Sequence, residues 1–172
     1  PATGKKGVYE ITDNYYKFWY RYLFTNRNYY EMLGTELASA EIMENINDYM
    51  GPIFEDMCRQ YLIRAAKQRK LPFVPYQIGK WWGNNPVLKA QDDIDILAVD
   101  KSGEKGLFCE CKFRNKPMPM EEYDDLVCAS EIFKNIKDKQ LIFFSKSGFT
   151  APVRERAERE HALLFTLEDL YK

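Results

Sequence analysis

Apolar residues recur at helical spacing between Pro52 and Lys70. This spacing predicts an amphipathic helix with Pro52 in its first turn, where proline is tolerated. A weaker helical segment is expected over 36–49 and should stop near Gly51-Pro52. Glu55 lies at the edge of the longer helix's apolar stripe, so we expect its carboxylate to be partly buried. The stripe consists of Phe54, Met57, Cys58, Tyr61, Leu62 and Ala65.

Short β-like runs follow this helix at 73–78, 93–99 and 107–113. The last two flank a turn-rich loop over 101–106, which favours a hairpin. The continuous apolar run over 141–144 is typical of a central strand that is buried on both faces.

The rest of the chain predicts a helix over 120–137, a charged helix over 152–160 and a short strand over 162–166. The order helix, three strands, helix, strand predicts a single α/β domain over 48–172. Residues 1–47 are expected to form a helical, aromatic-rich arm packed on this domain, its first helix capped by Thr12 or Asp13. A second interpretation stays open, in which the aromatic residues stack on nucleic-acid bases beside Lys17, Arg21 and Arg27.

The composition excludes several classes of protein. The chain has 172 residues, of which 45% are hydrophobic and 30% charged, so it is neither disordered nor fibrous. No stretch approaches the roughly 20 apolar residues that span a bilayer, and the start does not resemble a signal peptide. Since the chain opens at Pro1 without an initiator Met, we expect a fragment or a processed product. With a single histidine, His161, the four cysteines indicate reduced thiols rather than a disulfide framework or zinc site, hence a cytoplasmic location without a membrane partner.

Charge is distributed unevenly, although the net charge is −1. Residues 31–60 carry seven acids and one base, whereas residues 61–90 carry six bases and no acid. The basic block is either a solvated face or a surface that follows a phosphate backbone. The loop over 145–148 is either an ordinary turn or a place where backbone N–H groups meet phosphate. Candidate nucleic-acid contacts are Lys67, Lys70, Lys80, Trp82, Ser145 and Lys146, although at least one of Trp81 and Trp82 is expected to pack against the sheet edge.

Charged residues stand in matching phase on the second and third predicted strands. Glu110 and Lys112 share one face of the third strand, and apolar side chains occupy the other face. Asp95 interrupts the apolar second strand. A hairpin turn centred at Ser102-Gly103 pairs Asp95 with Glu110, with Cβ atoms about 5 Å apart. Two carboxylates at this separation repel, so a cation has to lie beside them.

That cation is either Lys112 or a divalent metal ion. Mg²⁺ (or Mn²⁺) takes oxygen ligands and keeps several waters, so Asp95, Glu110 and Glu55 suffice as ligands. Such an ion polarises a phosphodiester and activates water, while Lys112 orients that water or stabilises charge developing on phosphorus. The alternative is a structural salt-bridge cluster of Asp95, Glu110 and Lys112 without catalytic function.

In combination, these residues resemble the PD-(D/E)XK nuclease superfamily, whose core is an αβββαβ unit. More closely, the chain resembles the C-terminal domain of unknown function found behind AAA-type ATPase modules in archaea and some bacteria. Ile94 stands where the superfamily's motif has proline, a departure that the superfamily tolerates widely. The matching segments cover nearly the whole chain and are Tyr9-Glu10-Ile11-Thr12-Asp13 with Phe18-Trp19, Gly51-Pro52-Ile53-Phe54-Glu55, Ile78-Gly79-Lys80-Trp81-Trp82, Asp93-Ile94-Asp95-Ile96, Glu110-Cys111-Lys112 and Phe144-Ser145-Lys146-Ser147-Gly148-Phe149.

The resemblance implies a restriction-endonuclease-like fold, metal-ligand roles for Asp95 and Glu110, a catalytic role for Lys112 and a supporting role for Glu55. It implies a Mg²⁺-dependent nuclease that hydrolyses DNA phosphodiester bonds, with an ATPase and a DNA-binding winged-helix module upstream. The chain has no Gly-x-x-x-x-Gly-Lys-Ser/Thr phosphate loop, so we do not expect it to hydrolyse ATP itself. The alternative is an inactive nuclease-fold module for DNA binding or protein docking in that ATPase. The oligomeric state stays open, a homodimer included.

Overall fold

The computed structural model of the protein describes residues 11–86 and 89–171. The chain divides into two compact units, unit 1 (residues 1–49) and unit 2 (residues 50–172). This division lies close to the expected boundary after residue 47. Residues 1–10 of the expected aromatic-rich arm lie outside the described residues. Among the described helices, none is long and apolar enough to cross a membrane.

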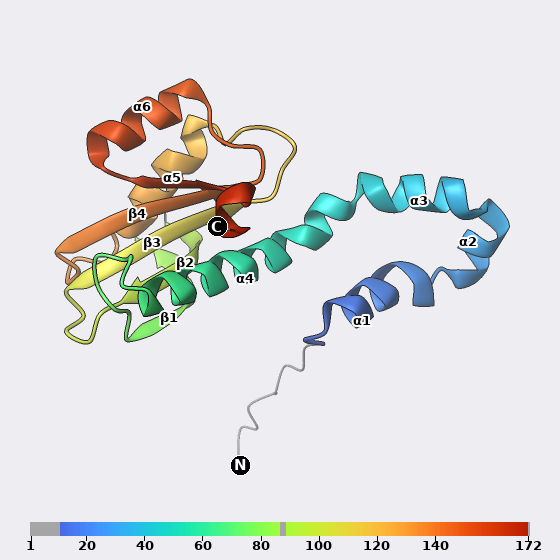
Figure 1. The fold of residues 1–172 in the computed structure, drawn as a ribbon, viewed down its shortest axis with the longest axis horizontal. Coiled ribbons are helices and arrows are strands. Elements are labelled where there is room, and N and C mark those ends of the chain that lie inside the picture. The colour runs from blue at the N-terminus through green and yellow to red at the C-terminus, as the bar shows by residue number, and fades with distance from the viewer. Residues whose placement is uncertain (1–10, 87–88, 172) are drawn as a thin grey trace, which may run out of the picture. The chain divides into compact units, whose positions relative to one another are not determined.

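Unit 1 consists of short helices (Figure 1). They are α1 (Asn14–Phe18), the π-helix η1 (Trp19–Phe24), α2 (Arg27–Leu33) and α3 (Thr35–Glu44). Of the two residues expected to cap the first helix, Asp13 is the N-cap of α1. Its Oδ1 accepts a hydrogen bond from the backbone N–H of Tyr16 at 3.1 Å. Tyr22 is buried, and its ring centre lies 5.0 Å from that of Phe18 and 5.8 Å from that of Tyr49. These aromatic contacts hold unit 1 together.

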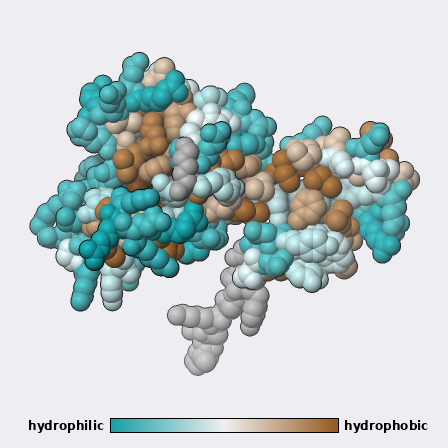
Figure 2. All heavy atoms as spheres, viewed as in Figure 1, coloured by the Kyte–Doolittle hydropathy of each residue, from teal (hydrophilic) through white to brown (hydrophobic). Residues whose placement is uncertain are grey.

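Large apolar side chains nevertheless remain exposed on unit 1, and Figure 2 shows part of this hydrophobic surface in brown. Residues of η1, α2 and α3 also line an apolar groove, among them Trp19, Leu23 and Ile42. Exposed apolar surface of this kind is typical of an interaction site. The exposed side chains include Tyr15, Tyr16, Tyr20, Phe24, Met32, Leu37 and Met43.

The sequence predicts a boundary between two helices at Gly51-Pro52, but the boundary lies at Asn45, between α3 and α4 (Ile46–Lys67), and α4 runs through Gly51 and Pro52. That prediction is wrong, and the two residues explain why. Proline disfavours a helical residue before it partly because its ring meets that residue's Cβ, and Gly51 has no Cβ. Pro52 lacks the N–H that would bond to the Asp48 carbonyl, but the helix continues on both sides of it.

Among the described residues, unit 2 contains a five-stranded sheet in the order β1-β2-β3-β4-β5. The strands are β1 (Gln77–Asn85), β2 (Ala90–Val99), β3 (Lys105–Lys112), β4 (Asp138–Ser145) and β5 (Leu163–Thr166). β2 pairs antiparallel with β1 and β3, which confirms the expected hairpin, and β4 pairs parallel with β3 and β5. The strand expected over 73–78 begins only at Gln77, because Pro72 and Pro75 have no N–H to donate to a ladder.

Helices α5 (Met120–Ser130) and α6 (Ala151–Glu160) cover one face of the sheet, α4 covers the other, and the 3₁₀-helix η2 (Leu167–Tyr171) follows β5 (Figure 1). The helix expected over 120–137 ends early, at Ser130. There Lys139 Nζ donates to the Ser130 carbonyl at 2.7 Å, and the chain continues in tight turns such as Phe133 N–H to Ser130 O at 3.2 Å. The predicted order of elements and the α/β class are confirmed.

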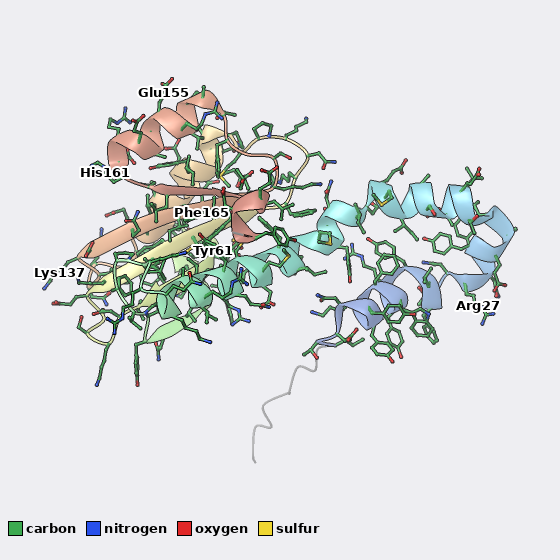
Figure 3. The ribbon with its side chains drawn as sticks, in the orientation of Figure 1. Arg27, Tyr61, Lys137, Glu155, His161 and Phe165 are labelled. Carbon is green, nitrogen blue, oxygen red and sulfur yellow. The ribbon has the colours of Figure 1, made fainter. Side chains whose placement is uncertain are left out.

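Two hydrophobic layers fill the spaces on either side of the sheet. Under α4 lie Leu107, Cys109 and Cys111 of β3, which confirms the expected apolar face of that strand. Figure 3 shows Tyr61 of α4 directed toward Phe165 of β5, with ring centres 5.1 Å apart. In the other layer, Ile94, Phe108 and Phe143 of the sheet pack with Tyr123 of α5 and Val153 of α6. The four cysteines are free thiols, as expected.

The tight packing of β3 is open to a direct test at Gly106. A Cβ at this position would lie 2.9 Å from the Phe108 ring and 3.0 Å from Ile136 Cγ2. Gly106→Ala should therefore lower the free energy of unfolding by about 1–3 kcal/mol, the usual effect of overpacking, measured in thermal melts. Gly79→Ala is the matched control, since its Cβ would meet nothing within 4 Å. Equal melting temperatures for both variants would contradict this account.

Candidate active site

The register between β1 and β2 shifts by one residue near the middle of the two strands. At this point Lys80 of β1 lies opposite two residues of β2, Asp95 and Ile96. An extra residue on one strand is a β-bulge, which redirects the side chains around it. The effect is visible in the core, where Ile94 and Ile96 belong to opposite hydrophobic layers. In a regular strand, residues two positions apart would share a face.

Asp95 lies one residue beyond the described ladder between β2 and β3. The expected hairpin register is confirmed for the described pairs, which begin with Ile96 and Cys109. The described ladder ends there, and the same register continued by one residue would place Asp95 opposite Glu110, so this pairing stays a prediction. Asp95 Oδ2 accepts the backbone N–H of Cys111 at 2.9 Å. The side chain of Asp95 is 9% exposed, and this hydrogen bond fixes its carboxylate against β3.

The ammonium group of Lys80 joins three carboxylates at the bulge. Its Nζ lies 3.1 Å from Asp93 Oδ2 and 3.2 Å from both Glu55 Oε2 and Asp95 Oδ1. Burial opposes the charge of Lys80, but Asp95, Asp93 and Glu55 outweigh it and raise the pKa of Lys80. Burial and then the negative charge of Asp95 raise the pKa of Glu55. Because Glu55 belongs to α4, this cluster ties that helix to the sheet.

A second ammonium group, that of Lys112, lies between Glu110 of its own strand and Glu122 of α5. Lys112 forms an ion pair with Glu110, and its Nζ lies 2.8 Å from Glu122 Oε2. The other carboxylate oxygen of Glu122 accepts Arg114 Nη1 at 2.7 Å. The side chains of Glu110 and Glu122 are only 13% and 14% exposed, so these charges are largely shielded from water.

The carboxyl group of Glu110 carries the clearest sign of electrostatic conflict. Burial, and after it the charge of Asp95, raises the pKa of Glu110 to about 8, although Lys112 acts in the opposite direction. Asp95 and Glu110 are therefore close enough to repel each other. Burial also opposes the charge of Lys112, but Glu110 and Glu122 raise its pKa, so Lys112 is cationic at neutral pH. Burial is thus the main reason that the Glu110 carboxyl group resists ionisation, with the charge of Asp95 second.

The residues predicted to form a site are in part brought together. Asp95, Glu110 and Lys112 meet at one end of the β2–β3 hairpin, and Glu55 joins them through Lys80. Across residues 11–86 and 89–171, however, no group of three or more His, Cys, Asp or Glu side chains is placed so that it could hold a metal ion. Lysine ammonium groups lie between the carboxylates instead. The prediction that Lys80 contacts nucleic acid therefore conflicts with its place inside this cluster.

Sequence reasoning missed two carboxylates and the role of Lys80. Asp93 stands two positions before Asp95, and the alternation of the strand was a usable signal for it. Glu122 stands in the first turn of α5, where an acid interacts favourably with the helix dipole. That local signal does not relate Glu122 to Lys112, because only the folding of α5 onto β3 brings the two together.

The remaining candidate nucleic-acid contacts lie on separate surfaces. Lys67 ends α4, and a rise of 1.5 Å per residue places it roughly 18 Å along the helix from Glu55, with Lys70 beyond it. Trp82 is 76% exposed. Trp81 packs on Phe133 with ring centres 5.1 Å apart, which confirms that one of the two tryptophans packs against the sheet.

Ser145 and Lys146 follow one another at the end of β4 but differ in exposure. Ser145 is 1% exposed, so its side chain is not available to a nucleic acid, contrary to the prediction. Its Oγ has no hydrogen-bond partner within the described part of the chain. Lys146 Nζ donates to Asn115 Oδ1 at 2.7 Å and lies 4.5 Å from the centre of the Phe113 ring.

All of the charged residues in the two lysine clusters fall inside a recognised family. A family model of archaeal and bacterial proteins of unknown function, DUF234, matches residues 19–143. The chain belongs to the DUF234 family. An uncharacterised protein of Methanocaldococcus jannaschii is 31% identical to this DUF234 chain over 166 residues, which cover 96% of the chain and 35% of that relative. The chain thus spans about a third of the relative's length, and no solved structure matches it significantly.

The raised pKa of Glu110 predicts how the stability of the fold depends on pH. The folded domain holds the Glu110 proton more tightly than the unfolded chain does, so ionisation of this carboxyl group destabilises the fold. In metal-free buffer, this contribution to stability should be lost as pH rises from about 4.5 to about 8. Glu110→Gln has no proton to lose, so its melting temperature should fall less than that of the wild type over this range.

Thermal melts in EDTA from pH 5 to pH 9 (roughly one unit beyond the raised pKa) measure this difference. Glu121→Gln is the matched control, because it changes an exposed carboxylate in the same region and should follow the wild type. If the melting temperatures of Glu110→Gln and the wild type changed in parallel with pH, ionisation of Glu110 would not be what destabilises the fold.

Proposed function

We propose that this DUF234 domain is a nuclease of the PD-(D/E)XK kind, which hydrolyses DNA phosphodiester bonds with Mg²⁺ (or Mn²⁺). The observation that carries the proposal is the meeting of Asp95 with Glu110 and Lys112 beside the β-bulge. This meeting needs Asp on one strand and Glu-x-Lys on the next, which is the arrangement that the resemblance to the superfamily implies. Perturbed carboxylates beside a buried lysine are typical of catalytic sites.

The fold of unit 2 supports the same proposal. Its elements run α4, β1, β2, β3, α5 and β4, in the αβββαβ order of a restriction-endonuclease-like core. The antiparallel hairpin β2–β3 and the parallel pair β3–β4 bring the site to one end of the sheet. Fold alone does not establish an activity, so the weight of the proposal rests on the side chains.

The donor atoms at the site fit a hard divalent cation. Mg²⁺ is usually held by one or two carboxylates together with water and substrate phosphate, so Asp95 and Glu110 meet its needs, with Glu55 in support. Burial, and after it the charge of Asp95, raises the pKa of Glu110, and a bound cation would oppose both effects. The ammonium group of Lys80, held by three carboxylates at 3.1–3.2 Å, marks where positive charge is already accommodated. When bound, the metal ion would lower the pKa of a water molecule and polarise the phosphodiester.

The chain's own residues then have distinct tasks. Lys112 is held on one side by Glu110 and on the other by Glu122, so its ammonium group has a fixed position. Since its pKa is raised, Lys112 acts as a cation that stabilises charge developing on the phosphate oxygens rather than as a base. Asp95 is fixed by the Cys111 N–H, which keeps one carboxylate oxygen directed away from the backbone for other contacts.

The proposal extends to the full-length protein. The relative from Methanocaldococcus jannaschii is much longer than this chain, which leaves room in such proteins for further domains. We assign to them an AAA-type ATPase and a winged-helix module, with DNA as the common partner and the cytoplasm as the location. A homodimer is compatible with this assignment.

A second candidate function has its own supporting observations. Lys80 and Lys112 already pair with the site carboxylates, as a purely structural cluster would require. Unit 1 exposes apolar side chains and an apolar groove, as a docking module would. In this alternative the domain keeps the nuclease fold but binds DNA or a protein partner within the ATPase, without hydrolysing phosphodiesters.

Incubation of the chain with supercoiled plasmid and with single-stranded DNA in Mg²⁺ or Mn²⁺ separates the two functions. The wild type should nick DNA, and Glu110→Gln and Lys112→Met should each reduce the rate by about 100-fold or more, because each removes a charge needed at the reacting phosphate. EDTA should abolish the activity. Glu121→Gln should retain wild-type activity.

Cleavage at the wild-type rate by both Glu110→Gln and Lys112→Met would contradict the assignment of catalytic roles to these residues. Absence of cleavage of either DNA in both metals, by a wild-type protein that is folded, would favour the docking function.

A further inference from the structure

Two loops leave the carboxyl ends of the neighbouring parallel strands β3 and β4, residues 113–119 and residues 146–150. They lie side by side, joined by a β-bridge between Met118 and Phe149 (Figure 1). Further hydrogen bonds connect them: Lys146 N to Lys112 O at 3.0 Å, Met118 N to Gly148 O at 2.9 Å, Thr150 N to Met118 O at 3.2 Å and Ser147 Oγ to Arg114 O at 2.7 Å. The two loops therefore form one braced surface directly beyond Lys112.

This surface is cationic. The segments 112–119 and 145–150 contain four basic residues and no acid. We call Arg114, Lys116 and Lys146, the three that lie in the loops, the cationic platform. The Arg114 side chain is 62% exposed, Lys116 is exposed and Lys146 is half-buried.

Two members of the cationic platform are held in place by neighbouring side chains. Arg114 is braced by Glu122 at 2.7 Å. Lys146 is braced by the neutral amide of Asn115 at 2.7 Å and by the face of the Phe113 ring. Side chains that are already ordered lose less conformational entropy when they bind an anion. The cationic platform is thus pre-organised to bind several phosphate groups.

Its position in the sheet also points to a ligand. In α/β sheets, ligands bind outside the carboxyl ends of parallel strands, which is where both loops begin. The basic end of α4, with Lys67, Arg69 and Lys70, lies elsewhere. The chain leaving α4 first joins the sheet where Tyr76 N–H donates to Val99 O at 2.8 Å, at the hairpin end that is remote from Lys112.

We propose that the cationic platform holds the sugar-phosphate backbone of a nucleic-acid strand and delivers it to Lys112. This inference rests on the proposed nuclease function and adds the surface that its substrate occupies. Contacts of this kind neutralise phosphates without reading bases, so binding is independent of sequence and depends strongly on salt. Of the predicted nucleic-acid contacts it keeps Lys146, adds Arg114 and Lys116, and leaves out Lys67 and Lys70.

Fluorescence anisotropy with a labelled DNA duplex, in EDTA and over a series of salt concentrations, tests the platform without any cleavage. The variant Arg114→Gln/Lys116→Gln/Lys146→Gln should bind more weakly, and its slope of log K against log salt should be shallower by about 0.9 for each phosphate that the variant no longer neutralises. The control Lys67→Gln/Arg69→Gln/Lys70→Gln removes the same charge from the far end and should bind as the wild type does. Lys116→Glu alone, at an exposed position, should weaken binding without affecting the fold.

The opposite pattern, with binding abolished in the α4 variant and kept in the platform variant, would overturn the inference. Equal affinity of wild type, platform variant and Lys116→Glu would also overturn it. Cleavage assays separate this failure from failure of the proposed function: a platform variant that cleaves DNA with unchanged KM refutes the platform but not the nuclease. Conversely, platform-dependent binding by a wild type that never cleaves DNA supports the platform and refutes the nuclease.

Discussion

The ion pairs of Lys80 with Glu55, Asp93 and Asp95 determine how the candidate active site is built. A carboxylate in a largely buried position is tolerated only when it is paired or hydrogen-bonded. Asp95 meets both conditions, through Lys80 on one side and the Cys111 N–H on the other. The β-bulge brings these partners within reach, because it places one residue of β1 against two residues of β2.

Further charged residues continue this cluster across the sheet. Burial, and after it the charge of Asp95, raises the pKa of Glu110. Glu110 pairs with Lys112, and Lys112 also pairs with Glu122 on α5. Helices on both faces therefore contribute a carboxylate, Glu55 from α4 and Glu122 from α5. This network gathers carboxylates around two ammonium groups, an arrangement that the proposed metal-assisted hydrolysis of phosphodiesters would use.

Much of the fold follows from local patterns. The hairpin register, the apolar face of β3 and the order of elements could be predicted because they depend on alternation and on turn residues close in sequence. The continuous helix α4 could not, because Gly51-Pro52 is typically a helix boundary and here is accommodated within a longer helix. The β-bulge could not either, since it depends on how two strands pair and no single strand encodes it.

The candidate site shows the same division. Asp95, Glu110 and Lys112 could be found from strand phase and from their resemblance to a known motif. The position of Lys80 among carboxylates, and of Glu122 beside Lys112, required the tertiary arrangement of α4, β1 and α5. The basic block over 61–90 does not lead to the proposed nucleic-acid surface, because the basic end of α4 and Lys112 lie at different ends of the sheet.

Calorimetric titration of Mn²⁺ is the most direct test of the central claim, that the carboxylates at the β-bulge hold a divalent cation. The wild type should bind Mn²⁺, and Asp95→Asn/Glu110→Gln should not. Lys80→Met should bind Mn²⁺ more tightly than the wild type, because it removes the ammonium group that competes for Glu55, Asp93 and Asp95. Absence of binding heat from both the folded wild type and folded Lys80→Met would contradict the account and leave the carboxylates a structural ion-pair cluster.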